Sequence, residues 1–202
     1  MTAIVDYDAG NVRSVEKAIV HLGGEAILTR DLAEIRKADH VIVPGVGAFG
    51  DAMERLHRYG LVEPLREVAA AGTPIMGICL GLQLFFEKSE EADPDVSGLS
   101  LLPGELKRFP ETEGYKIPQI GWNRLKIREG SRLFAGVPEG AFVYFVHSYY
   151  LKAANESDVA ATAEYMIPFD AAVERDNVFA TQFHPEKSGE IGLRILNNFL
   201  SL

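Results

Sequence analysis

The sequence predicts an α/β protein of three layers, in which helices cover both faces of a largely parallel central sheet. A smaller β-rich segment is expected in addition. Three observations lead to this prediction. Short apolar strands alternate with helical patterns through the first 88 residues, as in right-handed βαβ crossovers. A cysteine between two glycines follows one of these strands. After residue 88, glycines, prolines and β-formers replace the helical periodicity.

The expected elements of the first half follow from local patterns. Residues 3–7 form a short apolar run, which predicts a buried strand. An apolar stripe at helical spacing, ended by Gly23 and Gly24, predicts a helix at 11–22. The remaining elements are expected as a strand at 26–29, a charged helix at 32–37, a strand at 41–43, a helix at 61–71 and a strand at 75–78.

Strands are expected to dominate the second half. Residues 89–141 are rich in glycine, proline and charge, which predicts short strands and loops. Apolar residues at helical spacing predict a final helix at 191–200 that packs on the sheet. No long polar linker divides the chain, so we expect one domain over residues 1–202. Further strands are expected at 142–151, 169–174 and 178–183.

The composition narrows the class of protein. The 202 residues are 47% apolar and 24% charged, which is ordinary for a globular domain, and the net charge of −9 disfavours a nucleic-acid or anionic-membrane surface. The start of the chain lacks the pattern of a signal peptide, and no apolar run approaches the ~20 residues that span a bilayer. A single cysteine cannot form an internal disulfide. We expect a cytoplasmic protein, with neither a metal nor a cofactor.

The single cysteine, Cys79, is the first candidate catalytic residue. It lies between Gly77 and Gly81, where the predicted strand turns into a helix. This is the pattern of a nucleophile elbow, in which a Cβ on either side would meet the neighbouring backbone. The free N–H groups and dipole of the helix favour a thiolate there. A lone cysteine is otherwise most often a small buried hydrophobe.

A base for this thiol is expected from the histidines. His184 follows the predicted strand at 178–183, and active sites in α/β sheets gather beyond the carboxyl ends of strands. Glu186 lies two residues on, where it can orient the imidazole, as in a catalytic triad. A surface turn with incidental charges is the alternative for this segment. Three other histidines are interpreted as surface residues: His21, His40 and His57.

Acyl transfer also requires donors for the developing oxyanion. The backbone N–H of Leu80, the residue after the proposed nucleophile, is one candidate. The second is the glycine turn at 44–47, at the end of the neighbouring predicted strand. Glycines in that turn let the backbone approach a substrate closely. Such turns are common, so this observation is weak by itself.

Together these residues resemble the class I, or triad, glutamine amidotransferases. The segments that carry the resemblance are Pro44-Gly45-x-Gly47, Gly77-x-Cys79-x-Gly81-x-Gln83 and His184-x-Glu186, and they occur in the family's order. The resemblance implies a glutaminase in which Cys79 attacks the side-chain amide of glutamine and His184 passes a proton to the departing ammonia. It also implies that Gly47 and Gln83 hold the glutamine, and that Val46 supplies an oxyanion-hole N–H.

Further segments resemble one branch of this family, the glutaminase subunits of imidazole glycerol phosphate synthase. They are residues 6–11, 44–53, 118–123, 147–150 and 184–188. The resemblance implies a heterodimer with a cyclase subunit, a (βα)8 barrel, which uses the ammonia to form imidazole glycerol phosphate and an aminoimidazole carboxamide ribonucleotide in histidine biosynthesis. It assigns glutamine contacts to Ser148 and Tyr149. It assigns the partner interface to Asn11, Trp122, Asn123 and Lys187.

The residues leave other interpretations open. Trp122, the only tryptophan, is as often a core residue as an interface residue. A glutaminase for another synthase, such as one of vitamin B6, purine or anthranilate biosynthesis, would share every catalytic residue. A stand-alone cysteine hydrolase such as a γ-glutamyl peptidase is disfavoured by Gln83 and the turn at 44–47. An inactive binding subunit is disfavoured by the complete set of Cys79, His184 and Glu186.

Overall fold

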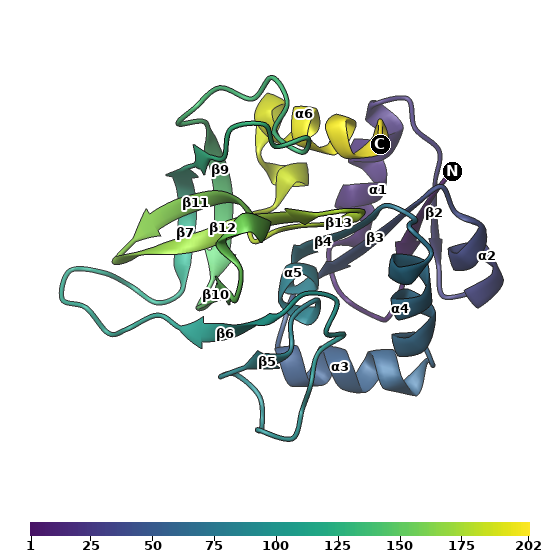
Figure 1. Ribbon diagram of the computed structural model, residues 1–202, viewed down its shortest axis with the longest axis horizontal. Coiled ribbons are helices and arrows are strands. Elements are labelled where there is room, and N and C mark those ends of the chain that lie inside the picture. Colours follow the sequence, from purple (N-terminus) through teal and green to yellow (C-terminus); the bar gives the residue numbers. More distant parts are fainter.

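A parallel sheet forms the centre of the molecule in the computed structural model, which describes residues 1–202 (Figure 1). Its first five strands lie in the order β2-β1-β3-β4-β13, and each neighbouring pair is parallel. The middle strands are almost wholly buried, which explains why they consist of continuous apolar runs. In that order the bounds are Ala26–Thr29, Thr2–Val5, His40–Gly45, Ile75–Cys79 and Val178–Thr181.

Helices cover both faces of this parallel sheet, as the alternating pattern predicts. Two of them, α1 (Val12–His21) and α6 (Gly189–Leu200), pack on one face through a cluster that includes Ile19, Ile42 and Phe199. The other face packs against a second cluster formed with α2 (Leu32–Lys37), α3 (Phe49–Arg58), α4 (Val62–Ala70) and α5 (Leu80–Leu84). Figure 1 shows the two groups on opposite sides of the strands.

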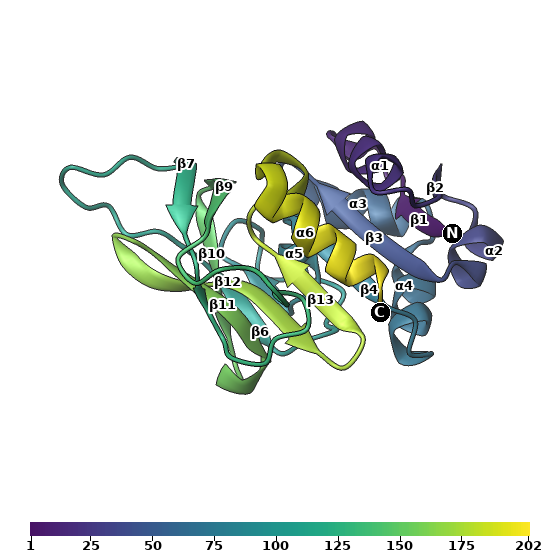
Figure 2. The ribbon, with the colours of Figure 1, turned by 90° about the horizontal axis from the view of Figure 1, so that it is seen from above.

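The sheet continues beyond β13 with antiparallel strands. It passes through β12 (Ile167–Arg175) and β10 (Tyr149–Ala153) to β6 (Gly104–Arg108), and β5 (Lys88–Ser89) pairs parallel to β6. Two strands extend it on the side of β12, namely β11 (Val159–Tyr165) and β8 (Lys126–Ile127). A separate antiparallel pair is formed by β7 (Gln119–Arg124) and β9 (Phe142–His147), which lie at the end of the molecule away from β1 and β2 in Figure 2. Two short 3-10 turns lie at Glu156–Asp158 and Pro185–Lys187.

The predicted fold class is confirmed, and three elements differ from expectation. The run at 142–151 is not one strand: it breaks at Ser148 into β9 and β10, which belong to different sheets. β-Formers flank the break on both sides, so nothing local marks it. The strand β11 and the full extent of α3 were not expected. None of the helices is both long and apolar enough to cross a lipid bilayer.

Candidate active site

The elbow at Cys79 has the strained geometry that its flanking glycines predict. Cys79 adopts φ 56° and ψ −108°, a conformation that costs a non-glycine residue about 1–3 kcal/mol. A Cβ on Gly77 would lie 2.5 Å from the Gly81 carbonyl oxygen. A Cβ on Gly81 would lie 1.8 Å from the carbonyl oxygen of Val43. Both glycines are therefore required for β4 to turn directly into α5, with Cys79 at the start of the helix.

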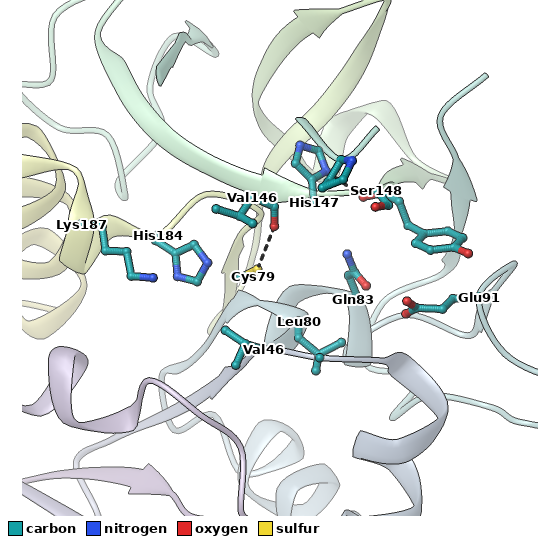
Figure 3. Close-up of a pocket in the computed structure, with 13 residues that line it drawn as sticks. Val46, Cys79, Leu80, Gln83, Glu91, Val146, His147, Ser148, His184 and Lys187 are labelled. Carbon is teal, nitrogen blue, oxygen red and sulfur yellow. Dashed lines mark hydrogen bonds between the residues drawn. The ribbon is translucent and has the colours of Figure 1, made fainter. Parts of the chain in front are cut away.

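His184 lies beside Cys79, just after the end of the adjacent strand β13, and Glu186 contacts its imidazole. The Nδ1–H of His184 donates to Oε1 of Glu186 at 2.8 Å, and the two side chains are 3% and 0% exposed. Burial opposes protonation of His184, but hydrogen bonds and charge from Cys79 and Glu186 outweigh it and raise the pKa of His184 to about 9. The arrangement therefore favours a protonated imidazole beside the sulfur (Figure 3).

Two candidate oxyanion donors, Leu80 and Val46, lie side by side near the sulfur (Figure 3). Leu80 is the first residue of α5, where a backbone N–H has no partner within the helix. Val46 lies in the turn after β3 and is 41% exposed. The buried hydroxyl of Tyr7 donates to the carbonyl of Pro44 at 2.6 Å and fixes the start of this turn. Gly45 is needed because a Cβ there would lie 2.2 Å from that hydroxyl oxygen.

Cys79, His184, Leu80 and Val46 line one cavity of about 270 Å³ (Figure 3). A cavity of this size suits a small substrate such as an amino acid. It opens beyond the carboxyl ends of the parallel strands, where ligand sites of open α/β sheets lie. Its far wall comes from the junction of β9 and β10. The site residues predicted from the sequence that line it are Val46, Gly47, Cys79, Leu80, Gln83, Ser148, Tyr149, His184 and Lys187.

Two residues of the site were missed in the sequence. Glu91 lines the cavity, and its carboxylate accepts from the backbone N–H of Phe49 at 2.8 Å. Gln182 is fully buried; its Nε2 donates to the Cys79 sulfur at 3.8 Å, and its Oε1 accepts from Gln83 at 3.1 Å. Gln182 was within reach of sequence reasoning, because residues two apart in an extended strand share a face and Gln182 precedes His184 by two. Glu91 lies in an acidic segment that offers no such signal.

His147, also missed, shapes the far wall of the cavity. Its Nδ1 donates to the carbonyl of Tyr149 at 2.7 Å, and its Nε2 lies 2.9 Å from the side-chain amide of Gln119. Burial lowers the pKa of His147 to about 4, so the imidazole is neutral at pH 7. These contacts hold the break between β9 and β10, which brings Ser148 and Tyr149 to the cavity.

The residues predicted at a partner interface occupy two places. Trp122 lies on β7, is 56% exposed and packs edge-on against Tyr144, so the alternative of a core tryptophan is wrong. Asn123 follows it and donates to the carbonyl of Glu164. Lys187 is exposed at the cavity rim. Asn11 precedes α1, and its side chain contacts Glu186. Of the three histidines interpreted as surface residues, His40 is half-buried and packs against Phe199.

Residues 3–202 match the family model described as glutamine amidotransferase class-I. The chain belongs to the class-I glutamine amidotransferases. Within this family it is similar to proteins named imidazole glycerol phosphate synthase subunit HisH. It is 51% identical to that of Moorella thermoacetica, with 98% of this chain and 92% of the relative covered. It is 50% identical to that of Bacillus cereus, with coverage of 98% and 93%, and 48% identical to that of Wolinella succinogenes, with both chains covered in full.

Solved structures show the same fold at lower identity. A crystal structure of a glutamine amidotransferase superposes with a TM-score of 0.77 at 20% identity, covering 98% of this chain and 97% of the other. A chain of PurLQS from Thermotoga maritima superposes with a TM-score of 0.74 at 20% identity, with coverage of 99% and 97%. These structures confirm the fold. The family match and the HisH relatives of about 50% identity show that the chain is an enzyme, a class-I glutamine amidotransferase.

Proposed function

We propose that this chain is the glutaminase subunit of imidazole glycerol phosphate synthase, which hydrolyses L-glutamine and passes ammonia to a cyclase subunit. The observation that carries the proposal is that Cys79 and His184 line one cavity, with Glu186 hydrogen-bonded to His184, in a chain about half identical to HisH subunits. A glutaminase for another synthase has the same triad, and it is the HisH relatives that favour this synthase.

In the proposed reaction, the Cys79 thiolate attacks the side-chain carbonyl carbon of glutamine. The N–H groups of Leu80 and Val46 stabilise the oxyanion of the tetrahedral intermediate. His184, protonated beside the thiolate, gives its proton to the departing amide nitrogen, which leaves as ammonia, and a γ-glutamyl thioester remains on Cys79. His184 then takes a proton from water, which attacks the thioester and releases glutamate. Glu186 orients the imidazole throughout.

Glutamine binding is assigned to the walls of the cavity. Gly47, Gln83, Ser148 and Tyr149 surround the space beside the sulfur and provide neutral polar contacts. Glu91 supplies a negative charge at the cavity wall, which complements the α-ammonium of glutamine. We therefore add Glu91 to the glutamine-binding residues that the sequence predicts.

The partner is proposed to be a cyclase subunit, a (βα)8 barrel, in a heterodimer with this chain. Trp122 and Asn123 on β7, Asn11 before α1 and Lys187 at the cavity rim are assigned to the interface. An exposed tryptophan of this kind is typical of a binding hot spot. Docking over the cavity rim gives ammonia a route to the barrel without passing through bulk water. The barrel then makes imidazole glycerol phosphate and an aminoimidazole carboxamide ribonucleotide for histidine biosynthesis.

We also propose that the chain acts as one domain, without a cofactor, in the cytoplasm. The family match runs over residues 3–202 without interruption, which supports one domain. The single free cysteine suits a reducing compartment, where a catalytic thiol stays reduced.

A glutaminase assay with and without the cyclase subunit and its ligand tests the proposal. We expect glutamine hydrolysis to rise when the liganded cyclase binds. We expect Cys79→Ala to abolish glutamine-dependent synthesis, by about 10⁴-fold or more, and to leave ammonia-dependent synthesis by the complex intact. Loss of both activities would indicate a structural cysteine. Stimulation by a different synthase and not by the cyclase would assign the chain to another biosynthetic pathway. The proposed glutaminase reaction would still stand.

A further inference from the structure

We propose that Asn11 is a positioning residue of the glutaminase site, which holds the carboxylate of Glu186 against His184 in addition to its place at the expected partner interface. The inference rests on the proposed function. Three independent features of the structure carry it: the contact of the Asn11 side chain with Glu186, the absence of the helix cap that this side chain would ordinarily make, and the anchoring of the loop before it.

The contact joins two segments that are 175 residues apart in the sequence. Nδ2 of Asn11 donates to Oε1 of Glu186, the same oxygen that accepts from Nδ1 of His184. The other carboxylate oxygen of Glu186 is buried and has no hydrogen-bond partner. The orientation of this buried carboxylate is therefore set at one oxygen by two N–H donors, one from the imidazole and one from Asn11.

Asn11 makes this contact instead of capping α1. It occupies the N-cap position, where asparagine is one of the preferred residues because its side chain accepts from the first N–H groups. Here no side-chain cap bond is formed. The backbone has φ 72°, in the left-handed region that asparagine tolerates better than most residues. That conformation begins the helix while the amide reaches Glu186.

The loop before Asn11 is held from outside the helix. Arg30 donates to the carboxylates of both Asp6 and Asp8 at 2.8 Å. The hydroxyl of Tyr59 also donates to Asp8, and Arg55 donates to the carbonyl of Asp8 at 2.7 Å. The three donors lie on other elements: Arg30 directly follows β2, Arg55 lies on α3, and Tyr59 lies at the end of α3. The loop that carries the Asn11 amide is therefore held in place by its neighbours.

The physical effect of Asn11 follows from the flexibility of glutamate. The terminal torsion of a glutamate side chain is broad, so one bond to the imidazole leaves the carboxylate free to rotate about it. A second donor on the same oxygen restricts this rotation. A misplaced carboxylate would leave the imidazole less well oriented toward the sulfur of Cys79, and small errors of this kind reduce rates by as much as 100-fold.

Asn11→Gly is the most direct test, because glycine accepts the same φ and costs an N-cap only a few tenths of a kcal/mol. With saturating cyclase subunit, its ligand and glutamine, we expect kcat to fall roughly 10- to 100-fold with KM for glutamine unchanged. Asn11→Asp, similar in shape, should lose at least as much, because it places a second carboxylate against Glu186. Asp176→Gly is the matched control: Asp176 has φ 51° in the turn before β13, at the end of that strand away from the site, and kcat should not change.

A double-mutant cycle separates positioning from docking. If Asn11 acts through Glu186, Asn11→Gly should cost nothing further in a Glu186→Ala background. A less well oriented Glu186 carboxylate stabilises the protonated imidazole less. In the free chain, NMR should therefore place the titration midpoint of His184 lower in Asn11→Gly than in the wild type, and loss of docking cannot cause this shift. An unchanged kcat, or the same loss in both backgrounds, would overturn the inference and leave Asn11 as an interface residue alone. A wild-type complex without glutaminase activity would overturn the proposed function as well.

Discussion

The two halves of the sheet contribute different things to the site. The parallel half, from β2 to β13, carries the reacting groups Cys79 and His184 at the ends of buried strands. The antiparallel half, with the β7–β9 pair, carries the wall residues Ser148 and Tyr149 and the exposed Trp122. We call the first the rigid half, because the backbone around the elbow admits only glycine at Gly77 and Gly81, and the second the open half, because it presents Trp122 to solvent.

The largest expected effect is a loss of stability caused by a substitution in the rigid half. In Gly81→Ala, the new Cβ would lie 1.8 Å from a backbone oxygen of β3 and cannot be accommodated without separating α5 from that strand. We expect a loss of about 3 kcal/mol or more in the free energy of unfolding, measured by urea denaturation. Gly60→Ala is the control. Gly60 has a positive φ of 65°, unlike Gly81, but nothing lies within 4 Å of an added Cβ, so this change should cost only about 1–2 kcal/mol. Equal losses would show that packing around the elbow is not tight.

A smaller effect is expected in the open half. Trp122→Ala should weaken binding of the cyclase subunit by about 2 kcal/mol, which is roughly 30-fold in Kd, measured by calorimetry. The stability of the free chain should change little, because the side chain is 56% exposed. Val20→Ala, at a 58% exposed position on α1, is the control and should not affect binding. If Trp122→Ala unfolds the chain and leaves binding intact, Trp122 is a structural residue and not a docking residue.

The last expected effect concerns the charge of His184. Its pKa is raised from 6.5 in the unfolded chain to about 9 in the folded one, so the stabilisation is complete below pH 6.5 and is lost as the pH rises through 9. Urea denaturation across this range should show a decline in the free energy of unfolding. The decline should be smaller in Cys79→Ala, because Cys79 is one source of the shift. A profile that is the same in both chains would mean that the thiol does not interact with the imidazole.

The sequence predicts the rigid half better than the open half, for physical reasons. The glycines around Cys79 and the short segment from His184 to Glu186 are local patterns, and their geometry follows from a few neighbouring residues. The contact of Asn11 with Glu186 joins segments 175 residues apart, and the capping preference of asparagine points to a different role. The break at Ser148 is a change of sheet within a continuous run of β-formers, which only tertiary pairing decides.

Trapping of the acyl-enzyme tests the central claim most directly. The complex of this chain with the liganded cyclase subunit is mixed with glutamine, quenched in acid within the first turnovers and digested for mass spectrometry. The account predicts that the peptide containing Cys79 gains the mass of one γ-glutamyl group, and that Cys79→Ala gains none. Glutamine turnover with Cys79 unmodified, or with the adduct on another residue, would contradict it.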